Sequence, residues 1–482
     1  MTAVLAIDQG TTSTRALAVE PDGKTSLVFS QTTRQIYPHP GWVEHDPHEL
    51  LASVRAAVEA APDGVRAVGL ANQGESCLAW DRETGEPLSR VIVWQDQRTE
   101  AHTNALRADG AEELTLARAG LPLDPYFSAS KLAWLYRNTP DAAALAAAGR
   151  LCLGTTDGFF RQHLTGRTET DIATASRTSL MSLDTGEWDA ELCALFGVPE
   201  TSLPTITPTH GALGAISRER VLAASIVDQQ AALRGHGCSA PGEAKITFGT
   251  GAFALAVSGT TRPAVGPGAL PTVAWGASDG ALTYALEGGV YAAGAAVNWV
   301  RELGLFGEFT ELNEGDTTPA IARGVTFVPA LTGLACPHWD RRAKGAWFGL
   351  SLDVDRGVLA RAVLEGVALR TAEVMAAIDR EAPPSGAISI DGGMSQNAYF
   401  CQFLADCLGR PITISSNPER TALGLAALSA EAIGQPFRLP EAGPPLIAEP
   451  QPPHWADRFA AAVAAVQNYA EVAEVFPNNG SL

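Results

Sequence analysis

The sequence predicts an α/β protein made of two related halves with a cleft between them. Short apolar or β-branched runs alternate with segments of helical periodicity along most of the 482 residues, which favours sheets covered by helices. The chain opens with three successive strand-like runs, and a similar glycine-threonine hairpin recurs near its middle. At this length two or three domains are expected.

The first half is predicted to begin with an antiparallel meander. Strands are expected over residues 2–7, 14–20 and 24–31, joined by a polar turn at 8–13 and a second turn at Pro21-Asp22-Gly23. A dinucleotide-binding fold would instead begin with a strand followed by a helix. Residues Asp46-Pro47-His48-Glu49 predict a helix start, because an Asp N-cap precedes Pro and Glu in the first turn.

A stretch of turn-forming residues, GHGCSAPG at 235–242, is predicted to separate the halves. After it, strands are expected at 244–248 and 252–257, joined by Gly249-Thr250-Gly251. The match between this hairpin and the first could also be accidental, since Gly-Thr turns are common. Helical spacing from Phe459 to Ala470 predicts an amphipathic helix near the C-terminus. The expected domains are residues 1–235 and 244–433, with a linker at 236–243 and a tail at 434–482.

Charge and cysteine content exclude several function classes. There are 34 Lys and Arg residues against 53 Asp and Glu residues, and the net charge of −19 repels nucleic-acid phosphates and anionic lipids. No apolar run approaches the roughly 18 residues of a membrane span, and no basic leader precedes the first strand. The seven cysteines are scattered and lack C-x-x-C spacing, so we expect reduced thiols in a cytoplasmic protein without a nucleic-acid or membrane partner.

The tip of the first hairpin is a candidate phosphate site. Gly10-Thr11-Thr12-Ser13 offers backbone N–H groups and hydroxyls that can surround phosphate oxygens, and Arg15 adds a positive charge. Asp8 is placed to hold a hydrated divalent cation. An ordinary turn remains the alternative. Two better-known nucleotide motifs fail, because Gly23-Lys24-Thr25 lacks the first glycine and helix of a P-loop, and Gly249-Thr250-Gly251 lacks a following helix and acid.

Two further segments could carry chemistry. Asp228 follows an apolar run and precedes Gln229 and Gln230, so its carboxylate could accept a proton from a substrate hydroxyl. The alternative is that this aspartate caps a helix. Gly392 and Gly393 end another strand-like run, ahead of an apolar helix expected at 398–408, and paired glycines let a backbone approach a flat ligand such as adenine.

In their order along the chain, these motifs resemble those of the FGGY carbohydrate kinases, and within that family the glycerol kinases. Tyr126–Asn138 fits the first family signature throughout, and Gly345–Glu365 fits the second except at Val358. The similarity runs from about Val4 to Ala432. The motifs that carry it are Asp8–Arg15, Gly41–Pro47, Trp94-Gln95, Asp124–Ser128, Asp228–Gln230, Gly249–Gly251 and Asp391–Gly393.

The resemblance implies two actin/hexokinase-like (ribonuclease H-like) domains that close over ATP, Mg²⁺ and a polyol. The activity implied is ATP-dependent phosphorylation of a primary hydroxyl of glycerol or a related small polyol or sugar, in a homo-oligomer that is a dimer or tetramer. Asp228 is then the general base, and Asp8 and Asp228 are the metal carboxylates. The implied polyol pocket comprises Gly74, Glu75, Trp94, Tyr126, Asp228, Gln229 and Phe253. The implied nucleotide and phosphate residues are Thr11, Thr12, Ser13, Arg15, Gly249, Thr250, Gly294, Asn298 (Gln in the family), Gly392, Gly393, Met394 and Asn397.

One departure from the family concerns the substrate. Glycerol kinases have arginine where this chain has Gly74, and that arginine donates to glycerol hydroxyls. Its loss removes charge-assisted hydrogen bonds of about 1.5–3 kcal/mol each and is expected to leave room for a larger group. The alternative function is therefore a kinase for a C4–C5 polyol or ketose with poor glycerol activity. A non-catalytic sugar or nucleotide sensor is a further alternative, which the intact Asp8 and Asp228 disfavour.

Overall fold

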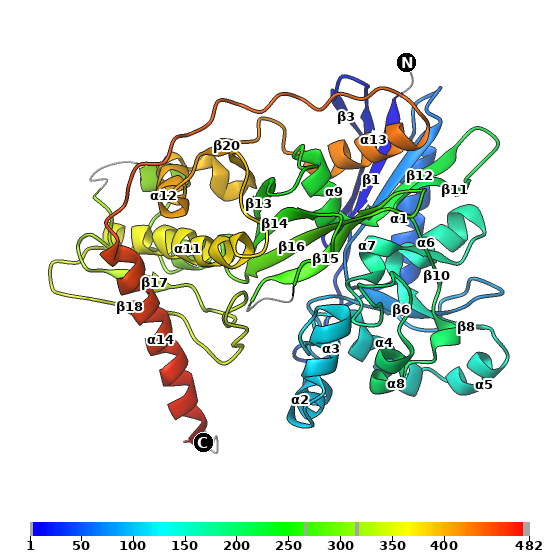
Figure 1. Ribbon diagram of the computed structural model, residues 1–482, viewed down its shortest axis with the longest axis horizontal. Coiled ribbons are helices and arrows are strands. Elements are labelled where there is room, and N and C mark those ends of the chain that lie inside the picture. Colours follow the sequence, from blue (N-terminus) through cyan, green and yellow to red (C-terminus); the bar gives the residue numbers. More distant parts are fainter. Residues whose placement is uncertain (1–2, 265–267, 314–317, 476–482) are drawn as a thin grey trace.

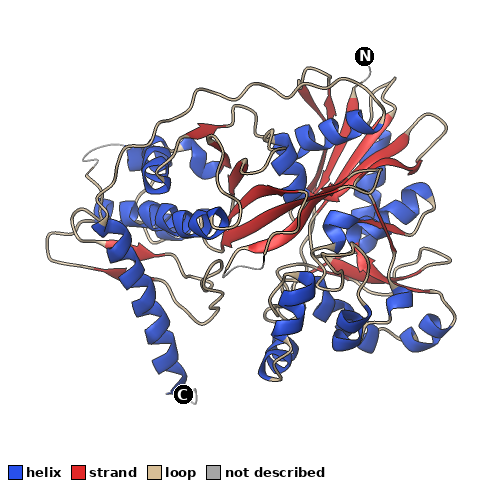
Figure 2. Ribbon diagram, in the orientation of Figure 1, coloured by secondary structure: helices blue, strands red, loops and turns tan. Residues whose placement is uncertain are grey.

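The computed structural model describes residues 3–264, 268–313 and 318–475. Two mixed six-stranded sheets form the centre of the molecule, and helices cover them (Figures 1 and 2). The predicted α/β class is confirmed, and so is the plan of two halves.

The first sheet contains the predicted meander. In spatial order its strands are β11 (His210–Ala215), β12 (Val221–Val227), β5 (Ala67–Asn72), β1 (Val4–Gln9), β2 (Ser13–Val19) and β3 (Thr25–Thr32). β1, β2 and β3 pair antiparallel, whereas β1 and β12 both run parallel to β5. The carboxyl ends of three parallel strands therefore lie at one edge, where ligands bind in sheets of this kind.

The second sheet repeats much of this plan. Its strands, in spatial order, are β15 (Leu270–Gly276), β16 (Leu282–Val290), β14 (Ala252–Gly259), β13 (Ala244–Phe248), β19 (Ile388–Gly392) and β20 (Ile412–Ile414). β13 pairs antiparallel with β14 and parallel with β19, as β1 does with β2 and β5. A strand follows Gly249-Thr250-Gly251, as expected for a hairpin and not for a dinucleotide motif.

Smaller sheets and most helices surround these two layers. A four-stranded sheet in the order β4 (Glu44–His45), β7 (Val91–Ile92), β6 (Cys77–Asp81) and β8 (Leu151–Thr155) extends the first half. Two strand pairs complete the sheets: β9 (Glu169–Asp171) with β10 (Thr205–Thr207), and β17 (Thr326–Val328) with β18 (Ala346–Phe348). The helices of the first half are α1 (Pro47–Glu59), α2 (Glu100–Ala108), α3 (Glu112–Ala119), α4 (Ser128–Asn138), α5 (Ala142–Ala147), α6 (Thr156–Thr165), α7 (Ile172–Ala175), α8 (Ala190–Phe196), η1 (Glu200–Ser202) and α9 (Asp228–Gly235). Those that follow are α10 (Gly294–Glu302), η2 (Phe309–Asn313), α11 (Arg356–Asp379), η3 (Gly393–Gln396), α12 (Ala398–Leu408), α13 (Arg420–Ala432) and α14 (His454–Val475).

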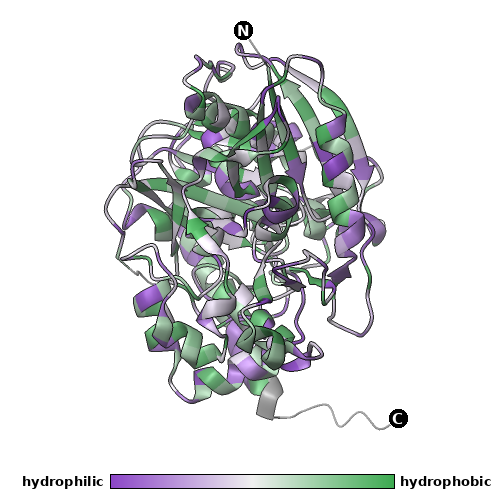
Figure 3. Cartoon of the chain, turned by 90° about the vertical axis from the view of Figure 1, so that its right-hand side faces the viewer, coloured by the Kyte–Doolittle hydropathy of each residue, from purple (hydrophilic) through white to green (hydrophobic). Residues whose placement is uncertain are grey.

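Three predicted helices form where the sequence placed them. Asp46 caps α1 by accepting from the backbone N–H of His48 and Glu49. α12 has the expected bounds, and α14 contains the C-terminal helical spacing but is longer than predicted. In Figure 3 the helices at the lower edge carry alternating hydrophobic and hydrophilic bands, as amphipathic helices do.

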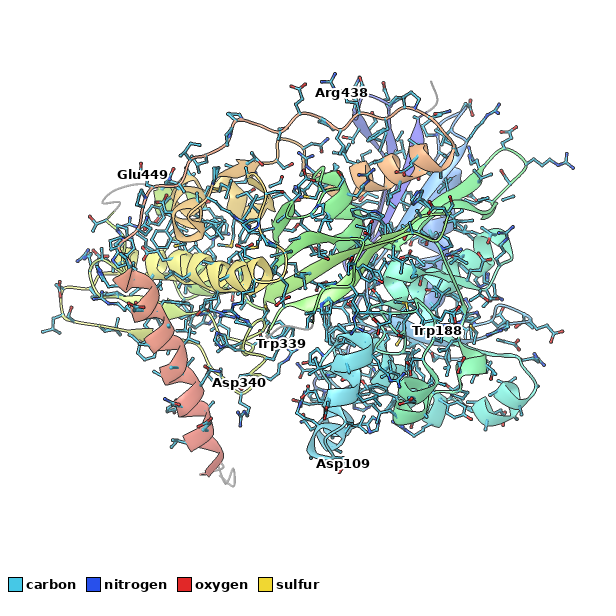
Figure 4. The ribbon with its side chains drawn as sticks, in the orientation of Figure 1. Asp109, Trp188, Trp339, Asp340, Arg438 and Glu449 are labelled. Carbon is cyan, nitrogen blue, oxygen red and sulfur yellow. The ribbon has the colours of Figure 1, made fainter. Side chains whose placement is uncertain are left out.

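α13 packs against α9 and the first sheet, although it comes late in the chain. The two helices touch through glycine: a Cβ on Gly424 would lie 1.8 Å from the backbone oxygen of Ala231. From α13 an extended segment runs across the molecule to α14, and Figure 4 labels Arg438 and Glu449 along it. One hydrophobic core combines residues of both sheets with α13, so the halves share buried apolar surface.

All seven cysteines lie in the described part of the chain, and none is in a disulfide. Burial raises the pKa of the Cys77 and Cys152 thiols to about 12, so they are unreactive at neutral pH. Across residues 3–264, 268–313 and 318–475, no helix is both long and apolar enough to cross a membrane.

Candidate active site

The carboxyl edge of the first sheet brings three predicted site residues together. Gln9 on β1, Asn72 on β5 and Val227 on β12 are in register. Asp8 therefore precedes this edge by one residue, Asp228 follows it by one, and Glu75 follows it by three. Parallel pairing of strands far apart in sequence is what gathers these carboxylates.

Asp228 is the first residue of α9 and directly follows the last residue of β12. It is not the N-cap of that helix, and its Oδ1 accepts from the backbone N–H of Gln229 at 2.7 Å. Burial, followed by the negative charge of Asp8, raises the pKa of Asp228 to about 7. A carboxylate with a pKa near the working pH is suited to accept a proton from an alcohol.

Asp8 provides a second half-buried carboxylate, beside the first tip. Burial raises the pKa of Asp8 to about 6, against the opposing charge of Arg15. In the part of the chain that the structure describes, no group of three or more His, Cys, Asp or Glu residues could hold a metal ion. Two carboxylates alone suit Mg²⁺, which usually takes one or two from the protein and the remaining ligands from phosphate and water. The residues present therefore fit a nucleotide-bound Mg²⁺.

Several predicted polyol residues lie near one another, since the charges of Glu75 and Asp228 both help to raise the pKa of the Tyr126 hydroxyl. Glu75 is buried and has a left-handed backbone with φ of 57°, so the chain turns sharply after β5. The Trp94 indole donates to Thr11 Oγ1 at 3.0 Å and lies edge-on to the Tyr126 ring, 5.6 Å away between centroids. Phe253 on β14 and Gln229 on α9 are half-buried. The hydrogen bond from Trp94 thus connects Thr11, in the turn of the first hairpin, to the Trp94–Tyr126 aromatic pair.

Gly74 packs closely against a side chain of the neighbouring strand. A Cβ at this position would lie 2.8 Å from Val227 Cγ2, so the β-branched side chain at the end of β12 fills the place beside the glycine. At the Cβ position, therefore, a side chain from a neighbouring strand takes part of the volume that the loss of arginine was expected to free.

Three buried charged residues at the site were not predicted. Arg177, after α7, bonds to both Glu75 and Glu287 of β16, and Lys245 of β13 donates to Gln229 Oε1 at 2.6 Å. All three are nearly or fully buried. A usable signal was present for two of them, since Lys245 and Glu287 interrupt otherwise apolar strands and buried charges of this kind are paired.

A cavity of about 530 Å³ lies beside Gly249-Thr250-Gly251, the tip of the second hairpin (the second tip). It has the size of a small-molecule site. Its wall is mostly apolar, and Val297, Phe309 and Leu312 contribute to it. Seven predicted nucleotide residues line it: Gly249, Thr250, Gly294, Asn298, Gly393, Met394 and Asn397.

Glycines shape this cavity in two ways. A Cβ at Gly294 would meet the backbone oxygen of Gly249 at 2.5 Å, and one at Gly392 (φ 93°) would meet that of Phe248 at 2.2 Å. Gly393, by contrast, faces open space. The first two glycines allow close packing behind the cavity, and the third leaves its surface accessible to a flat ligand.

Thr11, Thr12, Ser13 and Arg15 lie at the first tip and do not line this cavity. The Arg15 guanidinium forms two hydrogen bonds to Glu419 at 2.7 and 2.9 Å, immediately before α13. Another cavity, of about 830 Å³, lies beside the Asp124–Arg341 ion pair and near the Trp339 and Asp340 labels of Figure 4. None of the predicted site residues lines it.

Comparisons with known proteins agree with this geometry. The family model described as the FGGY family of carbohydrate kinases, N-terminal domain, matches residues 3–229, and the C-terminal domain model matches residues 244–433. A glycerol kinase of Citrifermentans bemidjiense is 43% identical over 447 residues, 89% of this chain and 90% of that protein. One from Thermus brockianus is 45% identical over 439 residues, 88% of each chain.

Solved structures resemble the whole chain as well. The crystal structure of Plasmodium falciparum glycerol kinase with ADP has a TM-score of 0.87 and 27% identity, covering 97% of this chain and 98% of that one. Xylulose kinase from Rhodospirillum rubrum has a TM-score of 0.82 and 26% identity, covering 98% of this chain and 99% of that one. On the family match over both halves, this chain belongs to the FGGY family of carbohydrate kinases.

Proposed function

We propose that this protein transfers the γ-phosphoryl group of ATP to a primary hydroxyl of glycerol. The observation that carries the proposal is the position of Asp228, a half-buried carboxylate at the carboxyl edge of the first sheet, close enough to Asp8 for the charge of Asp8 to raise its pKa. The nucleotide cavity beside the second tip and the glycerol kinases at 42–45% identity support it.

In this proposal the protein positions the reactants and offsets charge. Asp228 accepts the hydroxyl proton as the oxygen attacks phosphorus, while Glu75 and Gln229 accept from or donate to the other hydroxyls. Trp94 and Tyr126 cover the carbon chain and exclude water. Mg²⁺, held through Asp8 and the phosphates, would offset the negative charge of the transferred group. Thr11 and Thr250 present hydroxyls and backbone N–H groups to the phosphates from opposite tips.

Glycerol is preferred here over a C4–C5 polyol or ketose because the glycerol kinases at 42–45% identity match this chain over about 90% of its length. We also propose the domain limits 1–235 and 244–433, a cytoplasmic location and a homo-oligomeric state for this enzyme.

The test is a substrate screen with coupled ADP detection over C3–C6 polyols and ketoses, with and without Mg²⁺. Glycerol should give the highest kcat/KM, and removal of Mg²⁺ should abolish turnover. A xylulose- or tetritol-specific enzyme with little glycerol activity would reject the proposed substrate while leaving kinase chemistry intact. No ADP release with any polyol or ketose would reject the kinase function itself.

A further inference from the structure

Arg177 is a buried arginine that bonds to Glu75, one of the predicted polyol residues. Its Nε donates to Glu75 Oε1 at 2.8 Å, and its Nη2 donates to Glu287 Oε1 at 3.0 Å. The guanidinium carbon lies 5.3 Å from the Phe127 ring centroid and 6.0 Å from that of Tyr126. The one guanidinium therefore contacts an acid from each half of the molecule and two aromatic rings.

The bond to Arg177 determines what Glu75 can do. The side chain of Glu75 is only 5% exposed, and a carboxylate buried to that degree tends to take up a proton. Arg177 favours the ionised form and engages one carboxylate oxygen. Within the described residues Glu75 Oε2 has no hydrogen-bond partner, so it is available to accept from a hydroxyl.

We propose that Arg177 is a positioning residue of the polyol pocket. It holds the Glu75 carboxylate as an oriented acceptor for polyol hydroxyls. Through Glu75 it supplies the guanidinium that position 74 lacks. This inference rests on the proposed function. Gly74 packs against Val227, so the charge reaches the pocket from the segment after α7 and not from the loop after β5. The bond to Glu287 also ties the acceptor to β16 of the second sheet.

The experiment is a double-mutant cycle on Glu75→Gln and Arg177→Gln, measured as kcat and KM for glycerol and for ATP. Arg177→Gln should raise KM for glycerol roughly 10–150-fold, as expected for a lost charge-assisted bond, with KM for ATP unchanged. The double variant should be no worse than Glu75→Gln alone. Losses that multiply in the double variant, or an unchanged KM for glycerol in Arg177→Gln, would overturn the proposal.

Two further variants separate positioning from folding. Arg177→Lys keeps a positive charge beside both acids and should recover part of the glycerol affinity; it also replaces Arg177→Gln if that variant does not fold. Arg161→Lys is the matched control, because Arg161 is equally buried and donates to Glu169 at 2.6 Å away from the pocket. It should lower Tm without changing KM for glycerol. A similar KM rise in both lysine variants would overturn the proposal.

A pH profile adds a readout that a merely structural arginine would not move. The pKa of Glu75 is raised to about 7, mainly by burial. The positive charge of Arg177 opposes this rise, and the negative charge of Glu287 adds to it. Lys131 and the Tyr126 hydroxyl are also titratable and lie nearby. Loss of Arg177 should therefore shift the acid limb of kcat/KM for glycerol to higher pH; an unshifted limb counts against the proposal. Wild-type protein inactive on every polyol would instead reject the proposed function.

Discussion

The two glycine-threonine tips occupy equivalent places in the two sheets but are built from different chemistry. Asp8 and Arg15 are cross-strand partners beside the first tip, whereas Thr247 and Phe253 are partners beside the second. The first tip therefore carries charge on both flanking strands. The second tip carries neither an acid nor a base at that position.

The second tip is characterised by close backbone packing, not by charged side chains. A Cβ at Gly251 would lie 2.8 Å from the backbone oxygen of Val290, and Gly294 packs on Gly249 in the same way. Two halves of similar topology can therefore contribute different kinds of groups to one site. In this protein ionisable groups flank the first tip, whereas closely packed backbone and an apolar cavity flank the second.

The largest expected effect tests the charged half. Asp228→Asn removes the proton acceptor and should lower kcat by about 10²–10⁴-fold, with nucleotide affinity retained, as measured by steady-state kinetics and calorimetric ADP binding. Glu365→Gln is the control, because burial also raises the pKa of Glu365 to about 7 but its carboxylate accepts from the backbone N–H groups of Ala320 and Ile321. It should lower Tm and spare kcat. A near-normal kcat in Asp228→Asn would break the assignment of chemistry to the first half.

A smaller effect tests the second half. Gly294→Ala places a methyl group 2.5 Å from the Gly249 oxygen and should cost about 1–3 kcal/mol of stability through overpacking, with a raised KM for ATP. Gly393→Ala meets no atom within 4 Å, so it should raise KM for ATP without lowering Tm. The measurements are thermal unfolding and KM for both substrates. Equal Tm values for the two variants would contradict the steric account of the second tip.

The smallest effect concerns Arg15. Its ion pair with Glu419 is partly exposed, 37% and 20% for the two side chains, so either Arg15→Gln or Glu419→Gln should change stability by no more than about 1 kcal/mol. If Arg15 also binds the phosphates of ATP, only Arg15→Gln should lower kcat/KM for ATP, by severalfold. Thermal melts and ATP kinetics of both variants provide the check. Identical kinetic losses would mean that Arg15 acts on the site only through Glu419.

Local patterns predicted much of the fold. The meander, the N-cap of α1 at Asp46, the second hairpin and the strand–glycine–helix run from β19 to α12 all depend on neighbours within a few residues. The ends of the elements were predicted less accurately. β1 spans Val4–Gln9, two residues later along the chain than predicted, so Asp8 lies within the strand and not in the turn. Strand ends depend on which backbone groups find partners on adjacent strands.

Other features arise only from contacts between distant segments. Arg15 and Glu419 are separated by 404 positions, and no periodicity links them. The same holds for the packing of α13 on the first sheet and of Val227 against Gly74. The motif residues were identified by type and order, but their burial and partners were not.

By itself, the sequence determined the α/β class, the two hairpins, the family and the residue types able to bind phosphate and accept a proton. These properties follow from turn chemistry, side-chain period and the intrinsic donors and acceptors of each residue. Only the tertiary structure decided the pKa of Asp228, the pairing of Glu75 with Arg177 and the closed space beside Gly74. The reason is physical: desolvation, ion pairing and packing are set by atoms that meet when remote segments fold together.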